Sequence, residues 1–263
     1  MSKVFFIGAG PGDKELITLK AIKIIEKADV IIYAGSLVNK EILDYSKNSS
    51  VKIYNSATMT LDETNRVILE NVRKRKIVAR IHTGDPSIYG AILEQIVLLE
   101  EAGVEYEIIP GVSSAFAAAA SIKTEFTLPE VSQTVIFTRM EGKTPVPERE
   151  KLRNIAKIGA TLIIFLSVSL IDEVKAELLK GAYSEETPVV IARRVSWKDE
   201  EIHFTSIKDM DKLVKEKGIK KTTLILVGEV FSRKYRDIST LKKSKLYDKY
   251  FSTEFRKGKD SCI

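Results

Sequence analysis

A glycine-rich loop near the start of the chain has residue types that could hold a nucleotide-like ligand. Gly8-Ala9-Gly10-Pro11-Gly12-Asp13 follows the apolar run 4–7 and precedes a helical pattern. In outline this is the G-x-G-x-x-G fingerprint, whose glycines and helix N-terminus hold a pyrophosphate. Two positions differ, because Asp13 replaces the third glycine and Pro11 has no N–H to offer a phosphate. The loop therefore favours a ligand without a pyrophosphate and disfavours a nicotinamide-dependent dehydrogenase.

Three further loops carry glycine or serine after a predicted strand, at 83–89, 110–114 and 166–169. In an open α/β sheet such loops converge on one crevice. Asp85, in Gly84-Asp85-Pro86, is either a turn residue that caps the next helix or a ligand for an amine or hydroxyl group. Ser113 and Ser114 have the same two interpretations: helix N-caps, or donors to a ligand carboxylate.

The sequence does not decide the roles of the histidines and of the basic residues. His82 lies at a predicted strand end beside Asp85, and these two are the candidates to test for a catalytic role; we assign no general base. His82 and His203 are the only histidines, and neither has acidic or cysteine neighbours in a metal-ligand pattern, so we expect no metal site. A polar and basic set in the second half either holds a carboxylate-rich substrate or is solvated surface: Ser132, Gln133, Thr134, Arg139, Lys143, Arg193 and Arg194.

Strand-like and helix-like patterns alternate along most of the chain. Apolar runs predict strands at 4–7, 30–33, 51–54, 77–81, 106–109, 134–138, 161–166, 188–193, 202–205 and 222–227. Amphipathic or small-residue runs predict helices at 15–27, 40–45, 61–74, 89–102, 113–121, 148–157 and 170–179. Thr60 and Glu63 have the spacing of a capping box at the start of helix 61–74.

This alternation predicts the α/β class, with two α/β domains and the active-site crevice between them. Residues 1–122 form the N-terminal α/β domain with the glycine-rich loop, and 123–231 form the C-terminal α/β domain. Residues 232–263 form a basic polar tail. The linker is placed at 122–130, where threonine, proline and polar residues interrupt the pattern.

Composition limits the partners. The net charge of +6 resides in the tail, where ten Lys/Arg face four Asp/Glu, so the remainder is neutral and no nucleic-acid partner is expected. No run of about 18 apolar residues predicts a membrane span, and the first residues do not have the pattern of a signal peptide. The single cysteine, Cys262, permits no internal disulfide and is expected to be incidental. We therefore expect a cytoplasmic protein without a membrane partner.

The loops together resemble the tetrapyrrole methyltransferases, a family that uses S-adenosylmethionine. The resemblance rests on 6–13 with 16–21 behind it, on Gly84-Asp85-Pro86-Ser87-Ile88-Tyr89-Gly90, and on Ile109-Pro110-Gly111-Val112-Ser113-Ser114. Residues 33–38, 128–134, 139–148 and 192–197 are similar to the branch that methylates carbon 11 of precorrin-4 or cobalt-precorrin-4. The resemblance runs from residue 4 to about 231, weakly into 244–247, and does not say whether the substrate carries cobalt.

The resemblance implies S-adenosylmethionine as methyl donor, a small-molecule tetrapyrrole substrate and a homodimer. It places the cofactor against Pro11, Thr83, Gly84, Asp85, Ile88, Ser113, Ser114, Leu166, Val195 and Thr223. It places the substrate against Gly10, Gly12, Tyr33, Ser36, Ser132, Gln133, Arg139, Lys143 and Arg193. The implied reaction is direct transfer of the sulfonium methyl to the ring carbon, in which the protein mainly aligns donor and acceptor.

Alternatives remain open. Within the family these are methylation of uroporphyrinogen III, of precorrin-2 or at another corrin position, and, on a protein substrate, diphthine synthesis. A dehydrogenase and a non-enzymatic tetrapyrrole- or nucleotide-binding module are the alternatives from other classes.

Overall fold

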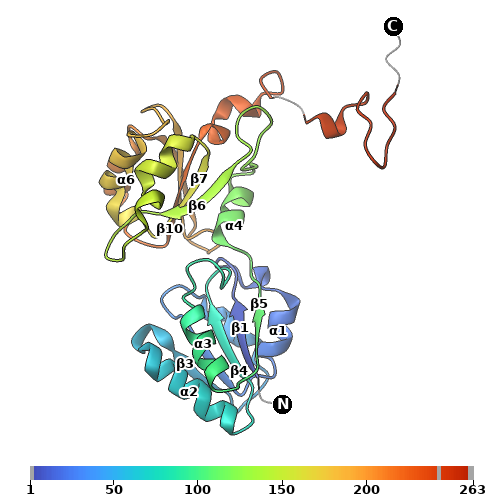
Figure 1. Ribbon diagram of the computed structural model, residues 1–263, viewed down its shortest axis with the longest axis vertical. Helices are drawn as coiled ribbons and strands as arrows, with labels where there is room; N and C mark the ends of the chain where they lie inside the picture. The colour runs from blue at the N-terminus through green and yellow to red at the C-terminus, as the bar shows by residue number, and fades with distance from the viewer. Residues whose placement is uncertain (1–2, 242–243, 260–263) are drawn as a thin grey trace. The chain divides into compact units, whose positions relative to one another are not determined.

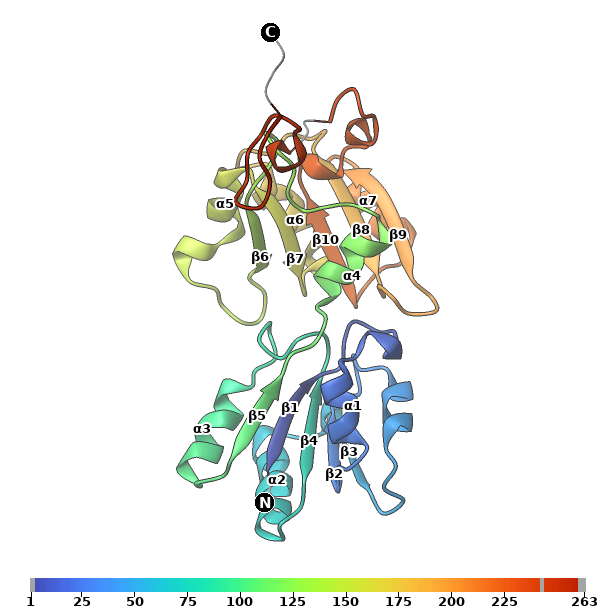
Figure 2. The same ribbon diagram turned by 90° about the vertical axis from the view of Figure 1, so that its right-hand side faces the viewer.

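The computed structural model describes residues 3–241 and 244–259, and Cys262 lies outside these ranges. The chain forms two compact units (Figures 1 and 2). Unit 1 comprises residues 1–121 and 194–201, and unit 2 comprises 122–193 and 202–263. The chain therefore passes between the units at 121/122, 193/194 and 201/202. The sequence-based division placed 194–201 in the C-terminal domain, whereas the structure packs this segment, here called the strap, on the N-terminal unit.

Unit 1 contains a five-stranded sheet in the order β3-β2-β4-β1-β5. Every pairing is parallel, which brings all carboxyl ends to one edge. The strands are β1 (Val4–Gly8), β2 (Val30–Tyr33), β3 (Lys52–Asn55), β4 (Val78–His82) and β5 (Tyr106–Ile109). Short loops at that edge are the usual ligand-binding position of an open parallel sheet.

Helices cover both faces of this sheet (Figure 1). They are α1 (Leu19–Ile25), α2 (Leu61–Arg73) and α3 (Leu93–Glu101). The remaining helix of unit 1, α4 (Ser114–Ser121), follows β5. Ile25 of α1 packs with Ile31 and Ile81 on one face, while α2 and α3 pack on the other through a cluster that includes Ile68 and Leu99. Because strand side chains alternate between faces, the apolar runs of the inner strands β1, β2 and β4 are buried on both sides, whereas most residues of the edge strands β3 and β5 are half-buried or exposed.

Unit 2 contains a mixed five-stranded sheet in the order β6-β7-β10-β8-β9. Its strands are β6 (Val135–Arg139), β7 (Thr161–Phe165), β8 (Pro188–Arg193), β9 (Glu201–Ser206) and β10 (Thr223–Val227). Strands β6 and β7 are parallel, and β10 is antiparallel to both β7 and β8. The carboxyl ends of β6, β7 and β8 therefore meet the amino end of β10 at one edge.

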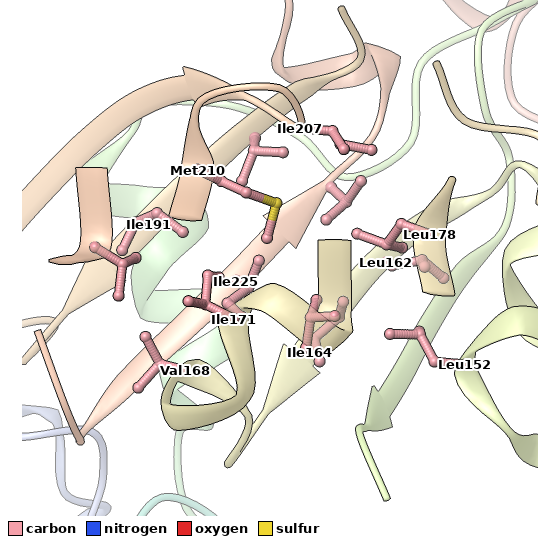
Figure 3. Close-up of a cluster of buried hydrophobic side chains, with 14 of the residues drawn as sticks. Leu152, Leu162, Ile164, Val168, Ile171, Leu178, Ile191, Ile207, Met210 and Ile225 are labelled. Atoms are coloured by element: carbon pink, nitrogen blue, oxygen red, sulfur yellow. The ribbon is translucent and has the colours of Figure 1, made fainter. Parts of the chain in front are cut away.

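The core of unit 2 lies between this sheet and three helices, α5 (Leu152–Ile155), α6 (Ile171–Leu178) and α7 (Met210–Glu216). Figure 3 shows Leu152, Ile171 and Met210 from these helices among strand side chains such as Ile164, Ile191 and Ile225. These interdigitated aliphatic side chains fix the sheet whose edge carries several of the predicted site residues.

The remaining elements are short 3-10 helices. They span Lys14–Leu16, Lys40–Tyr45, Ser56–Thr58, Glu148–Glu150, Ala156–Ile158, Val168–Leu170, Glu229–Phe231, Arg233–Arg236 and Lys245–Tyr247. Among the described residues, no helix is long and apolar enough to span a bilayer.

The predicted α/β class and its two sheets are confirmed. The capping box is also confirmed, since Thr60 accepts from the Glu63 N–H and the Glu63 carboxylate accepts from the Thr60 N–H.

Three helix predictions need correction. The helix expected at 89–102 begins only at Leu93, because Tyr89 and Ala91 adopt left-handed backbone conformations (φ 54° and 47°). The expected helix 15–27 is divided at Ile17 into a 3-10 turn and α1, and 148–157 is likewise divided into short pieces. Helix α7 was not predicted.

Candidate active site

Three glycines bring the loops of unit 1 into direct backbone contact at the carboxyl edge of its sheet. A Cβ atom at Gly8 would lie 2.6 Å from both the Gly111 nitrogen and the Gly84 oxygen. A Cβ at Gly111 would lie 2.2 Å from the Gly84 oxygen. Since no side chain fits between these backbones, glycine is required for the loops after β1, β4 and β5 to meet. Three of the four loops that were expected to converge therefore meet within unit 1, whereas the fourth, at 166–169, follows β7 in unit 2.

Three backbone hydrogen bonds join the first two loops. Gly10 and Gly84 exchange backbone hydrogen bonds of 3.2 and 2.8 Å, and the Ala9 N–H donates to the His82 carbonyl at 2.8 Å. Both glycines have left-handed φ angles, of 81° and 58°. The glycine-rich loop thus continues past the end of β1 as a short antiparallel contact with the loop after β4.

Asp85 ties the second loop to the third. One carboxylate oxygen accepts from the Ser87 N–H at 2.8 Å and the Ser87 hydroxyl at 2.5 Å, and the other accepts from the Gly111 N–H at 2.8 Å. Burial opposes ionisation of this carboxyl, but the bonds from Ser87 and Gly111 outweigh it and hold the pKa of Asp85 below its usual range. Of its two interpretations, the geometry supports the turn residue, extended to a bond across two loops.

The peptide groups of the glycine-rich loop are engaged by protein. The Ala9, Gly10 and Asp13 N–H groups donate to protein acceptors, and Pro11 has no N–H. The Pro11 carbonyl accepts from the Trp197 indole N–H at 3.0 Å, and the Gly12 carbonyl accepts from the Asn39 side chain at 2.8 Å. A loop with so few available donors does not match a pyrophosphate cradle, which supports the sequence-based reading of Pro11 and Asp13.

The strap supplies two of those contacts. Trp197 covers Gly12 so closely that a Cβ there would lie 2.2 Å from the indole, and the Arg194 guanidinium lies 4.1 Å from the indole ring centre. The Ser196 hydroxyl accepts from the Asp13 N–H at 3.0 Å. Arg194 and Ser196 both adopt left-handed backbone conformations, with φ angles of 48° and 65°. Non-glycine residues in that region are held there by surrounding contacts and concentrate at functional sites.

Other predicted residues of unit 1 differ in how accessible they are. Tyr33 is 6% exposed and belongs to the sheet core, so its side chain is packed among aliphatic residues, whereas Ser36 is exposed. The Thr83 hydroxyl donates to the Leu37 carbonyl at 3.4 Å, which links the loops after β2 and β4.

Four further predicted positions lie in local structure or in the buried part of the strap. The Ile88 N–H donates to the Asp85 carbonyl. Ser113 is buried and its hydroxyl accepts from the Ala115 N–H at 3.3 Å, as an N-cap does, while Ser114 is the first residue of α4. Val195 in the strap is 4% exposed.

His82 is buried and uncharged at neutral pH. Burial, reinforced by the nearby positive charge of Arg80, lowers the pKa of His82 to about 3. Its Nε2 atom is buried without a hydrogen-bond partner among the described residues. Arg80 itself is 8% exposed and donates to the Gln95 side chain at 3.2 Å. A histidine with so low a pKa does not carry a proton near pH 7, so the structure gives it no ionised role.

Four predicted residues of unit 2 meet at one edge of its sheet. Arg139 ends β6, Leu166 follows β7, and Arg193 at the end of β8 pairs with Thr223 at the start of β10. Leu166 has a φ of 54° and is 64% exposed. A large apolar residue that is both strained and exposed is a candidate for ligand contact.

The guanidinium of Arg139 is already engaged. It donates to the carbonyls of Met140, Thr144 and Pro145 at 3.3, 3.2 and 2.8 Å. These bonds organise the loop 140–147, so the structure assigns Arg139 to holding this loop rather than to a free carboxylate clamp.

Two other predicted substrate residues, Ser132 and Gln133, are not brought to that edge, whereas Lys143 follows Arg139 in the loop after β6. Ser132 and Gln133 precede β6 and so lie at the end of the strand opposite Arg139. The Ser132 hydroxyl donates to the Thr134 carbonyl and accepts from the Thr161 N–H. Lys143 is exposed in loop 140–147. Across the described ranges, no three or more His, Cys, Asp and Glu side chains are grouped so as to hold a metal ion.

Sequence reasoning did not single out Trp197, Ser196 or Asn39 as site residues. Their partners in the glycine-rich loop lie 186, 183 and 27 positions away, so no local pattern reveals the contacts. The one available signal was that Trp197 is the only tryptophan of the chain.

Comparison with known proteins decides the family. The family model described as tetrapyrrole (corrin/porphyrin) methylases matches residues 3–211. The chain belongs to the tetrapyrrole methylases. The predicted resemblance is thereby confirmed.

Two relatives of this tetrapyrrole methylase are both named cobalt-precorrin-4 C(11)-methyltransferase. The cobalt-precorrin-4 C(11)-methyltransferase of Methanocaldococcus jannaschii is 58% identical over 97% of this chain and 96% of that protein. The enzyme of that name from Priestia megaterium is 46% identical over 97% of this chain and 98% of that protein.

Solved structures agree with this tetrapyrrole methylase fold. The crystal structure of a cobalt precorrin-4 methyltransferase, CbiF, has a TM-score of 0.85 and 46% identity, covering 88% of this chain and 96% of that chain. A uroporphyrin-III C-methyl transferase from Thermus thermophilus, solved with S-adenosylhomocysteine, has a TM-score of 0.73 and 26% identity, covering 87% and 93%.

Proposed function

We propose that this chain transfers a methyl group from S-adenosylmethionine to carbon 11 of cobalt-precorrin-4 in cobalamin biosynthesis. The observation that carries the proposal is the 58% identity to a cobalt-precorrin-4 C(11)-methyltransferase over nearly the full length of both chains. The relatives named precorrin-4 C(11)-methyltransferase, without cobalt, are 36–43% identical. This order favours the cobalt-bearing substrate, which the sequence alone left open.

The residues at the carboxyl edge of unit 1 fit the proposed methyl donor. S-adenosylmethionine supplies a methyl group on a positively charged sulfur and carries no phosphate. The glycine-rich loop offers few free N–H donors, since those of Ala9, Gly10 and Asp13 are engaged and Pro11 has none. Such a loop fits a phosphate-free nucleoside better than a dinucleotide.

The role of this chain's residues is to position rather than to exchange protons. The carbon of the ring forms a bond to the methyl group while the sulfur–methyl bond breaks and its electron pair stays on sulfur. Gly8, Gly84 and Gly111 fix the backbone of three loops, and Asp85 locks two of them together. A rigid cradle of this kind contributes to rate by alignment of donor and acceptor. His82, with a pKa of about 3, is not positioned as a charged acid at pH 7.

One assay tests this function. The purified protein is incubated with S-adenosylmethionine labelled in its methyl group and an enzymatic system that generates cobalt-precorrin-4. We expect label at carbon 11 of the product and none in a parallel reaction with uroporphyrinogen III. Label in the uroporphyrinogen product alone would refute the proposal in favour of that position, and tight NAD binding without methyl transfer would refute the methyltransferase function altogether.

The resemblance to the family also leads us to propose a homodimer in the cytoplasm. Light scattering coupled to size-exclusion chromatography tests the first part, with a mass of twice 29.5 kDa expected. Cell fractionation tests the second.

A further inference from the structure

The strap, residues 194–201, makes its principal contacts with the glycine-rich loop of unit 1 although it lies between β8 and β9 in the sequence. The Trp197 indole donates to the Pro11 carbonyl at 3.0 Å and lies against Gly12. The Ser196 hydroxyl accepts from the Asp13 N–H at 3.0 Å. Three consecutive loop residues are therefore held from the strap side.

The strap is itself braced. Arg194 stacks on the Trp197 ring at 4.1 Å and donates to the Asp199 carboxylate at 2.7 Å. Glu200 accepts from the Ser196 N–H at 2.6 Å and from the Ser121 hydroxyl at 2.9 Å. These bonds fix the indole on both sides, between the guanidinium and the loop. These contacts hold Arg194 and Ser196 in left-handed conformations. Such strained residues concentrate at functional sites and are not needed in a loop that merely connects two strands.

The glycine-rich loop, unlike the strap, is not braced by its own side chains. Gly10 and Gly12 carry no side chain, and Gly10 has a φ of 81°, so on either side of Pro11 the backbone gains little rigidity from its own residues. Its position over the sheet edge depends on bonds from outside: Gly84 at Gly10, Trp197 at Pro11, Asn39 at Gly12 and Ser196 at Asp13.

We propose that Trp197 is a positioning residue for the methyl-transfer reaction, which it serves by holding the Pro11–Gly12 peptide in place through its indole N–H and ring. This inference rests on the proposed function, since it assigns to the loop the alignment of donor and acceptor. Trp197 contacts the loop and is not expected to take part in bond making. Its loss lowers the fraction of complexes that are aligned, so it affects turnover more than cofactor affinity.

The test compares Trp197→Phe with Lys198→Ala. The first variant keeps an aromatic ring and removes the N–H donor; the second, a matched control on the same strap, removes only an exposed ion pair between Lys198 and Glu41. Hydrogen–deuterium exchange of residues 8–13 reports whether the loop is held. Calorimetric titration with S-adenosylhomocysteine gives the dissociation constant and the fraction of active sites, and the labelled-methyl assay, with substrate supply in excess, gives kcat.

For Trp197→Phe we expect faster exchange in residues 8–13 and a kcat about three- to tenfold lower, the effect of one lost hydrogen bond. The dissociation constant for S-adenosylhomocysteine stays within about twofold and the binding stoichiometry is unchanged. Lys198→Ala matches the wild type in all readouts. Fluorescence of Trp197, the only tryptophan, shifts in the wild type when S-adenosylhomocysteine binds.

Wild-type exchange rates at 8–13 in Trp197→Phe, or a wild-type kcat, would overturn the proposal. A lower kcat that follows only a lower binding stoichiometry would also overturn it, because that pattern is misfolding. A wild-type protein that neither binds S-adenosylhomocysteine nor transfers methyl refutes the proposed function instead, and the exchange comparison then decides alone whether the strap holds the loop.

Discussion

Replacing Gly111 with alanine tests whether the three converging backbones define the candidate site. The added methyl carbon would lie 2.2 Å from the Gly84 oxygen, 2.7 Å from the Gly8 Cα and 2.8 Å from the Gly8 carbonyl carbon. Normal contact distances are about 3.5 Å, so the loops must separate by about 1 Å. No flexible side chain is among these neighbours, and the displacement therefore falls on the backbone.

The loss of stability follows from the overpacking and from the hydrogen bonds that this displacement lengthens. Overpacking costs about 1–3 kcal/mol, and each hydrogen bond that is lengthened adds about 1 kcal/mol. The bonds at risk are Gly111 N–H to Asp85 and the Gly10–Gly84 pair. We expect Gly111→Ala to lower the free energy of unfolding by about 3 kcal/mol, which lowers the melting temperature by about 10 °C.

Gly103→Ala is the matched control. Gly103 has a φ of 65° but nothing within 4 Å of its added Cβ, so its cost is purely conformational. That cost is about 1 kcal/mol, or about 3 °C. Thermal unfolding is followed by the fluorescence of Trp197, which reports on unit 1 because the strap belongs to it. A melting temperature for Gly111→Ala equal to that of the control would refute the close approach of the three loops.

Three further outcomes are expected. Asp85→Asn destabilises the protein at neutral pH, because an amide cannot accept all three bonds from Ser87 and Gly111. The pKa of Asp85 is lowered in the folded state, so its contribution to stability is present above the unfolded pKa and is lost as the pH falls through the folded pKa. Chemical denaturation should therefore show a difference in stability from wild type that shrinks in acid, and a difference independent of pH would contradict this. Thr60→Ala removes the capping box of α2 and costs about 1 kcal/mol, measured as a lower melting temperature; an unchanged value would show that the cap is not needed. His82 has a pKa of about 3, so its NMR ring signals, assigned with His82→Gln, stay constant from pH 5 to 8; a midpoint within that range would contradict its burial.

Most elements could be predicted from the sequence because their signals are local. Strand β2 at Val30–Tyr33 and the capped start of α2 match their predictions, since an apolar run and a cap are set by neighbouring residues. Helix α7 was missed because only Met210, Leu213 and Val214 mark it within a short polar stretch. The late start of α3 results from left-handed residues at Tyr89 and Ala91, which residue type does not announce.

The candidate site was predictable in its loops but less so in its side chains. Glycine in a loop after a strand signals close backbone approach, and Gly8, Gly84 and Gly111 meet as that signal indicates. A charged residue carries no such information, because its partner decides its role. Arg139 binds three nearby carbonyls and Asp85 binds an N–H 26 positions away, and neither partner could be inferred from residue type.

The strap contacts the glycine-rich loop at both positions that depart from a dinucleotide fingerprint. Pro11 has no N–H, and its carbonyl accepts a hydrogen bond from the Trp197 indole. The Asp13 N–H donates to the Ser196 hydroxyl. Both polar groups that a phosphate would require are thereby absent or committed to protein. A glycine at position 13 alone would not restore phosphate binding, because Ser196 would still accept its N–H and Trp197 would still cover Gly12. Which polar groups of the loop remain available to a ligand is therefore decided by loop and strap together, and the loop sequence by itself does not reveal it.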